Sequence, residues 1–226
     1  MSGFAARATN ALLPEEKRAV AIHESGHALV AALSEHADPV AKVTILPAGQ
    51  ALGVTEQLPV DERHLYPESY LLDSLAIRMG GRAAEALVLD EVSTGASNDL
   101  AGATELATRM VREFGMSPRL GPVGFASGSP QYLGTEEIRS RPYAEATQRV
   151  VDEEVSRLLT EAEKRATSLL AEHRDGLDRL VDLLLDRETV DGSEVDAVLG
   201  RTPRPPAGER EVALTHAAVE PGPASG

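Results

Sequence analysis

The sequence predicts a mainly α-helical domain that contains a small β-sheet or hairpin and ends in a helical bundle. Most long stretches repeat apolar residues at the three-to-four-residue spacing of a buried or amphipathic helix. One short region alternates apolar and polar residues between turn-forming residues, as a hairpin does. With 226 residues and 42% hydrophobic content, the chain can bury one good core. We therefore expect a single main domain, over residues 14–200.

The first expected helix follows a short arm. Residues 1–13 are small and polar without periodicity, which is typical of a linker. Pro14 suits the first turn of a helix, and the acidic residues behind it favour the positive end of the helix dipole. The helix should continue to about Glu35, before the break at Asp38-Pro39. Ala and Val occur on every side of it, so we expect it to be largely buried.

Two short strands are expected next. The segments VAKVTILP and ALGVTEQLP are β-branched and alternating, and the turn Pro-Ala-Gly-Gln at residues 47–50 separates them. They predict a hairpin with at least one free edge.

From about Tyr66 the chain returns to helical spacing, and we expect a second buried helix pair there. Gly80-Gly81 marks either a break or a close crossing of helices. The run STGASND is turn-forming and N-capping in composition, so it predicts a helix that starts near Asn98 or Asp99. Gly115 is placed to end that helix.

The remaining segments predict a loop, a bundle and a tail. Residues 116–134 are rich in Gly, Pro and Ser and predict a mobile loop beside the site. Amphipathic runs at about 137–173 and 175–187 predict a helical bundle. Residues 189–199 resemble a turn followed by one short capped helix. Residues 201–226 are so rich in Pro, Gly and Ala that we expect them to be disordered.

Composition excludes several classes of function. The 36 acidic residues against 22 basic ones give a net charge of -14, which would repel a phosphate backbone, so nucleic acid is not expected as a partner. The chain has no cysteine, so a transition-metal site must be built from histidine and carboxylate. There is no long apolar run and no secretory signal. We therefore expect a soluble, cytoplasmic domain.

The residues His23-Glu24-Ser25-Gly26-His27 form an H-E-x-x-H motif inside the first expected helix. A shuffled chain of this composition would contain only about 0.02 such matches. Histidines four apart project from one helix face, so both can reach one zinc ion. Zinc can hold a water molecule at an open position, where Glu24 could take its proton as a general base.

A third protein ligand is normally needed, and the residues alone leave it open. The longer metzincin motif is excluded, because Val30 and Leu33 stand where it requires Gly and His. The remaining candidates are Glu85, Asp90, Glu91, Asp99 and His64. Asp99 could instead cap a helix, and Glu85 could be a charged residue at the rim of an apolar helix. These two are the serious candidates, and they stand close to even.

Several motifs in unbroken order over residues 14–199 resemble the peptidase domain of the FtsH family of ATP-dependent zinc metalloproteases. They are HESGH, VTILPAGQALGVTEQLP, the block GGRAAEALVLDEVSTGASNDLAGATELATRMVREFGMSPRLGP, and the late run EEVSRLLTEAEKRATSLLAEHRDGLDRLVDLLLDRETVDGSEVDAVL. The resemblance implies that the aspartate of STGASND, Asp99, is the third zinc ligand. It also implies a mainly helical fold whose edge strand, around Gly53 to Leu58, pairs with extended substrate.

The same resemblance implies a homo-hexameric ring and an AAA+ ATPase module with membrane spans ahead of the peptidase domain, which then lies on the cytoplasmic side. This sequence contains no phosphate-binding G-x-x-x-x-G-K-[ST] motif, so we expect it alone to cleave unfolded chains independently of ATP. Two departures stand out. HESGH replaces the more usual HEAGH, and the turn after the first strand lacks the basic residue that is common in the family.

The leading hypothesis is a zinc-dependent endopeptidase that acts on unfolded or membrane-derived proteins, with His23, His27 and Asp99 as ligands and Glu24 as base. A competing hypothesis is a non-catalytic, zinc-containing assembly module of a hexameric protease ring. The intact Glu24 argues against that hypothesis, because a scaffold needs no base beside its metal. A small-molecule hydrolase is disfavoured by the exposed strand edge that we expect.

Overall fold

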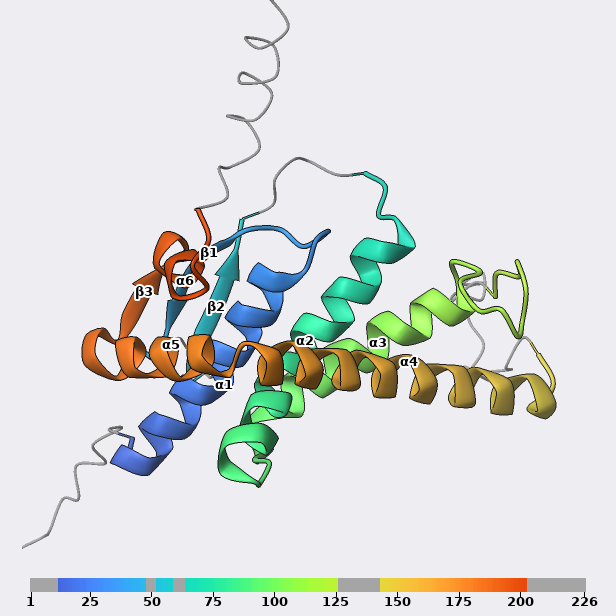
Figure 1. Cartoon of the computed structure of the whole chain (residues 1–226). Helices are drawn as coiled ribbons and strands as arrows, with labels where there is room; N and C mark the ends of the chain where they lie inside the picture. The colour runs from blue at the N-terminus through green and yellow to red at the C-terminus, as the bar shows by residue number, and fades with distance from the viewer. Residues whose placement is uncertain (1–11, 48–51, 59–63, 126–142, 203–226) are drawn as a thin grey trace, which may run out of the picture.

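The computed structural model describes residues 12–47, 52–58, 64–125 and 143–202 (Figure 1). In chain order, the elements are α1 (Pro14–Leu33), β1 (Val40–Thr44), β2 (Val54–Gln57), α2 (Glu68–Leu89), the 3-10 turn η1 (Thr94–Ala96), α3 (Ser97–Arg112), α4 (Glu145–Glu172), α5 (Arg174–Arg187), β3 (Thr189–Asp191) and α6 (Gly192–Val198). The predicted class, mainly α with a small sheet, is confirmed.

Helix α1 is the most deeply buried element. At its start the Glu16 carboxylate accepts a hydrogen bond of 2.8 Å from the Leu13 N–H, which would otherwise lack a helical partner. Every residue from Val20 to Ala32 is buried. Because neighbours surround it on all sides, α1 has no polar face, which explains the Ala and Val on each side of its sequence.

Helix α2 packs against α1 at a crossing of glycines. A Cβ on Gly80 would lie 2.7 Å from the Gly26 carbonyl oxygen, and a Cβ on Gly26 would overlap the Gly80 carbonyl. The two backbones can approach this closely only without side chains at both positions. Since α2 runs unbroken through Gly80 and Gly81, the prediction of a close crossing is confirmed. The alternatives of a break and of a separate helix pair in this segment are wrong.

The sheet has the order β2-β1-β3, and both pairings are antiparallel. Val43 of β1 stands opposite Thr55 on one side and Val190 on the other. The predicted hairpin is confirmed, and β2 forms an edge of the sheet within the described residues. Residues 189–199 were expected to begin with a turn, which is wrong. Three of them form β3, because β1 supplies a partner far away in the sequence, whereas the short helix α6 is as expected.

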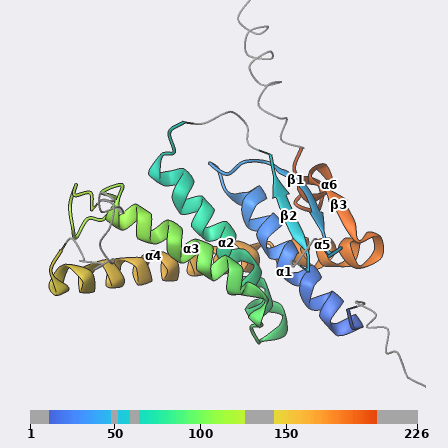
Figure 2. The same ribbon diagram turned by 180° about the vertical axis from the view of Figure 1, so that it is seen from behind.

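The C-terminal helices cover the two central ones. Figures 1 and 2 show α4 lying along α2 and α3, while α5 contacts α1. The predicted bundle is therefore present, although α4 begins at Glu145 rather than near 137. Residues 1–11 of the expected arm, 126–142 of the expected loop and helix, and 203–226 of the expected tail lie outside the described residues. Within the described ranges, no helix has the length and apolar character that a bilayer span requires.

Residues after α3 are tied to α4 through a buried carboxylate. Glu154 is 1% exposed and accepts a hydrogen bond of 2.9 Å from the Ser117 hydroxyl. The guanidinium of Arg157 also donates to it, through Nε and Nη2 at 3.1 Å each. The bonds from Arg157 lower the pKa of Glu154 below its ordinary value of 4.5, against the opposing effect of burial, and Ser117 adds to the lowering. Glu154 is thus ionised when it holds this segment.

We expect Glu154→Gln to lower the free energy of unfolding at pH 7 by about 1–3 kcal/mol, because it removes a buried charged acceptor. The folded pKa of Glu154 lies below the unfolded one, so this contribution is present above the unfolded pKa and is lost as the pH falls through the folded pKa. Urea unfolding at pH 7 and near pH 3 measures it. The matched control is Glu153→Gln, since that exposed residue pairs with Arg119 and should matter little. A penalty that is equal at both pH values would contradict the prediction.

Ser25 is fully buried in α1, and its hydroxyl has no hydrogen-bond partner among the described residues. A buried hydroxyl without a partner destabilises a fold by about 1–3 kcal/mol. We therefore expect Ser25→Ala to raise the free energy of unfolding by about 1–2 kcal/mol in chemical denaturation. Ser156→Ala on an exposed part of α4 is the control for helix propensity, worth about 0.5 kcal/mol. A destabilised Ser25→Ala variant would mean that the hydroxyl is bonded after all.

Candidate metal centre

Three predicted ligands meet at one point. His23 and His27 project from the same face of α1, and their Nε2 atoms are 3.0 Å apart. Asp99 approaches from α3, with its Oδ2 3.2 Å from His23 Nε2 and 3.4 Å from His27 Nε2. Among the described residues, these three form a group of histidine and carboxylate donors close enough to share a metal ion.

The remaining ring nitrogens are held by α2. His27 Nδ1 donates to the Ile77 carbonyl oxygen at 2.7 Å, and His23 Nδ1 lies 2.7 Å from Glu85 Oε1. Donation from Nδ1 leaves the Nε2 lone pair of each ring free for a metal, and it fixes the ring orientation. Glu85 is 2% exposed and also accepts bonds from the backbone N–H and hydroxyl of Ser93.

This geometry separates the two carboxylates that the residues alone left even. Glu85 lies against the outer nitrogen of His23, away from the point where the three donors meet, while Asp99 lies at that point. Asp99 is the third residue of α3, and Ala96, which cannot cap through its side chain, precedes the helix. Asp99 is therefore not the N-cap of α3, although it lies in the first turn of that helix, as the alternative interpretation also allowed. Asp90, Glu91 and His64 are exposed and do not belong to the group.

The donor set fits zinc. A tetrahedral ion with bonds of about 2.0–2.1 Å needs neighbouring donors about 3.3 Å apart, close to the observed 3.0–3.4 Å. Space beside the donors is kept open by Gly81, where a Cβ would lie 2.5 Å from His23 Nε2 and 2.6 Å from His27 Nε2. Two imidazoles and one carboxylate leave a fourth position for water or substrate, as catalytic zinc sites do.

The electrostatics of the chain favour a positive charge at this point. Burial lowers the pKa of His23, but hydrogen bonds to Asp99 and Glu85, helped by the charge of Glu24, outweigh it and raise the pKa to about 9. Burial raises the pKa of Asp99, yet its bonds to both histidines hold that pKa well below its usual range. The pKa of Glu85 is also lowered. Burial alone would raise this pKa, but the hydrogen bonds from His23 and Ser93 have the larger effect. The charges around His23 thus favour the protonated ring, and the same charges would favour a bound cation.

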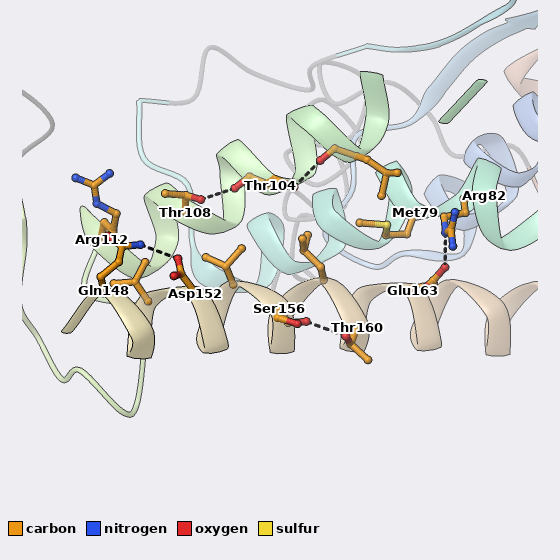
Figure 3. A pocket seen from close by; sticks show the side chains of 14 residues that line it. Met79, Arg82, Thr104, Thr108, Arg112, Gln148, Asp152, Ser156, Thr160 and Glu163 are labelled. Atoms are coloured by element: carbon orange, nitrogen blue, oxygen red, sulfur yellow. Dashed lines mark hydrogen bonds and ion pairs between the residues drawn. The ribbon is translucent and has the colours of Figure 1, made fainter. Parts of the chain in front are cut away.

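The side chain of Glu24 extends from α1 toward strand β2 of the sheet. It is 7% exposed, and the Thr55 hydroxyl on β2 lies 2.8 Å from its Oε2. Its negative charge contributes to the raised pKa of His23. A groove elsewhere on the molecule is separate from the donor group. The groove of about 640 Å³ between α3 and α4 in Figure 3 is lined by none of the donor residues, and its Arg82 is paired with Glu163 at 2.8 Å.

Comparison with known proteins shows the family of this chain. The sequence profile of peptidase family M41 matches residues 10–198, which is most of the chain. The chain belongs to peptidase family M41. The resemblance found in the sequence motifs is thereby confirmed, and the matched range contains every residue of the donor group.

The chain is similar in sequence to three proteins that are each called ATP-dependent zinc metalloprotease FtsH. The relative from Acidothermus cellulolyticus is 59% identical over 92% of this chain, and the one from Acidimicrobium ferrooxidans is 55% identical over 84%. The relative from Pelobacter propionicus is 48% identical over 82%. The chain spans 31%, 29% and 30% of these proteins, respectively, so it corresponds to less than a third of each.

Sequence reasoning missed the residues that support the M41 donor group. The contacts of Ile77, Ser93 and Thr55 join positions between 8 and 50 residues apart, so no local sequence pattern predicts them. Gly81 did give a signal, as half of the Gly-Gly pair, but that signal indicated a helix crossing rather than open space beside two imidazoles.

We expect Gly81→Ala to weaken zinc binding by at least about tenfold, because the added methyl group would displace the two imidazoles. Competition with a chromophoric chelator measures the affinity. Gly102→Ala is the matched control: it is the same change inside a helix, but its Cβ would meet the end of the flexible Arg78 side chain at 2.6 Å. Unchanged zinc affinity in Gly81→Ala would show that the donors do not need this space.

Proposed function

We propose that this chain is a zinc-dependent endopeptidase domain that hydrolyses peptide bonds of unfolded or membrane-derived proteins. The observation that carries the proposal is the convergence of His23, His27 and Asp99 at 3.0–3.4 Å, and Glu24 is buried next to His23 in the sequence of the same helix. Membership of peptidase family M41 and the names of the relatives support it.

In this proposal His23, His27 and Asp99 hold the ion. When bound, zinc acts as a Lewis acid that polarises the peptide carbonyl and makes water easier to deprotonate. Glu24 takes the proton of the attacking water on its carboxylate and then gives that proton to the nitrogen of the leaving amine. Glu85 and the Ile77 carbonyl keep the two imidazoles oriented, so the ligands need no rearrangement during turnover.

The substrate in this proposal binds as an extended chain. Strand β2 is an edge of the sheet, and its inner face touches Glu24 through Thr55. A peptide paired with that edge by main-chain hydrogen bonds would lie close to the base whatever its side chains. Pairing through the backbone requires an unfolded segment, which accounts for the proposed substrate class.

The wider assembly is inferred from the relatives. Their names state that proteolysis depends on ATP, and this chain corresponds to less than a third of their length. We propose that an AAA+ ATPase module unfolds substrates for this domain, and that the domain works as a homo-hexameric ring on the cytoplasmic side of a membrane.

We expect Glu24→Gln to lower the cleavage rate of a quenched, unfolded casein-like substrate by at least about 100-fold, because the general base is removed. Bound zinc should remain stoichiometric, since the substituted amide side chain would leave His23, His27 and Asp99 in place. A chelator should abolish the wild-type activity, and added zinc should restore it.

Glu15→Gln, at the exposed start of the same helix, is the matched control and should cleave like the wild type. Cleavage retained by Glu24→Gln would remove Glu24 from its role. Stoichiometric zinc in a wild-type chain that cleaves nothing would favour the assembly module instead.

A further inference from the structure

The carboxylate of Glu24 is held by a residue of the sheet. The Thr55 hydroxyl oxygen lies 2.8 Å from Glu24 Oε2 and 3.2 Å from the Glu24 carbonyl oxygen. A hydroxyl has one proton and donates to one acceptor at a time. The shorter contact is to the charged oxygen, and charge-assisted bonds are the stronger kind. Thr55 therefore donates mainly to the carboxylate.

The main-chain contact does not explain why a hydroxyl is present. Glu24 lies in the middle of α1, where its carbonyl oxygen accepts the N–H of the residue four positions later. That carbonyl is satisfied without Thr55. The Glu24 carboxylate has no helical partner of this kind, so the hydroxyl acts on the side chain.

The residue just before β2, Gly53, accommodates the other carboxylate oxygen. Gly53 precedes Thr55 by two positions, so the two share one face of an extended chain. A Cβ on Gly53 would lie 2.8 Å from Glu24 Oε1 and 2.7 Å from its Cγ. Thr55 on β2 thus gives Oε2 a hydrogen-bond donor, and Gly53 before the strand leaves space for Oε1. Together they define one position for the Glu24 side chain.

Position matters for a general base. A base must lie within hydrogen-bond reach of the proton that it removes, and a displacement of about 1 Å can cost about 100-fold in rate. A glutamate side chain has three rotatable bonds, and burial alone does not fix the torsion of its terminal carboxylate. The Thr55 bond fixes it.

We propose that Thr55 is a positioning residue for the general base: its hydroxyl acts through the Glu24 carboxylate rather than on the substrate. The inference rests on the proposed peptidase function, in which Glu24 takes the proton of water. It places the control of the base on β2, whereas α2 controls the orientation of the metal ligands.

The test compares Thr55→Val, which keeps the shape and loses the hydroxyl, with Thr55→Ser, which keeps the hydroxyl. With a quenched peptide substrate, we expect Thr55→Val to lower kcat about tenfold and to leave KM unchanged, because about one charge-assisted hydrogen bond is lost. Thr55→Ser should recover kcat to within about threefold of the wild type.

Thr44→Val is the matched control. It is the same substitution on the neighbouring strand β1, but its hydroxyl contacts Glu188 and Thr189 rather than Glu24. Its kcat should stay at the wild-type value. Zinc content and unfolding temperature are measured for every variant, so that a loss of fold or metal is separated from a loss of position.

A second readout does not depend on turnover. The 13C chemical shift of the Glu24 carboxylate, measured by NMR with and without zinc, should move in Thr55→Val and stay in Thr44→Val. If the wild-type chain does not cleave, the proposed function fails, and the carboxylate shift still decides whether Thr55 holds Glu24. The inference is overturned by an unmoved shift, by wild-type kcat in Thr55→Val, or by a loss that Thr55→Ser does not restore.

Discussion

The close approach of α1 and α2 at Gly26 and Gly80 is the constraint on which the site depends. A side chain at either position would collide with the opposite backbone, so this crossing exists only because both residues are glycine. The approach brings the Ile77 carbonyl and the Glu85 carboxylate within 2.7 Å of the two histidines. A wider separation would still bury the helices, but it would leave both imidazoles free to rotate. The contact between α1 and α2 therefore both packs the core and orients the proposed metal ligands.

The contact between α1 and α2 also brings charged groups together around His23. Glu85 is buried, so little water screens its charge, and Asp99 is partly buried; both carboxylates form hydrogen bonds with His23. Their effect exceeds the desolvation of the imidazole, which is why the pKa of His23 rises although the ring is buried. The carboxylates that raise this pKa would also favour a bound cation. Zinc binding at His23 would require the ring to lose its second proton, so metal binding and proton release would be linked.

The sequence predicts features that depend on local spacing and fails where distant segments meet. Histidines four apart on a helix share a face, so the motif alone predicts that His23 and His27 lie together, and their Nε2 atoms are 3.0 Å apart. Asp99 and Glu85 remained even, because each lies more than 60 residues from His23 and only the tertiary structure shows which nitrogen each one faces. The three residues of β3 escaped notice for the same reason, since their pairing with β1 carries no local pattern.

The two supports of the site come from different parts of the fold, and this division has a consequence for how the domain can vary. Helix α2 orients the proposed metal ligands through Ile77, Glu85 and the space at Gly81. Strand β2 contacts Glu24 through Thr55, and Gly53 just before the strand leaves space for the Glu24 side chain. Changes on α2 should alter metal affinity first, and changes on β2 should alter turnover first. Because β2 is also an edge of the sheet, a chain that pairs with it would press on the strand that holds the base. Substrate pairing and base position are then coupled through one short strand, without any motion of the metal ligands.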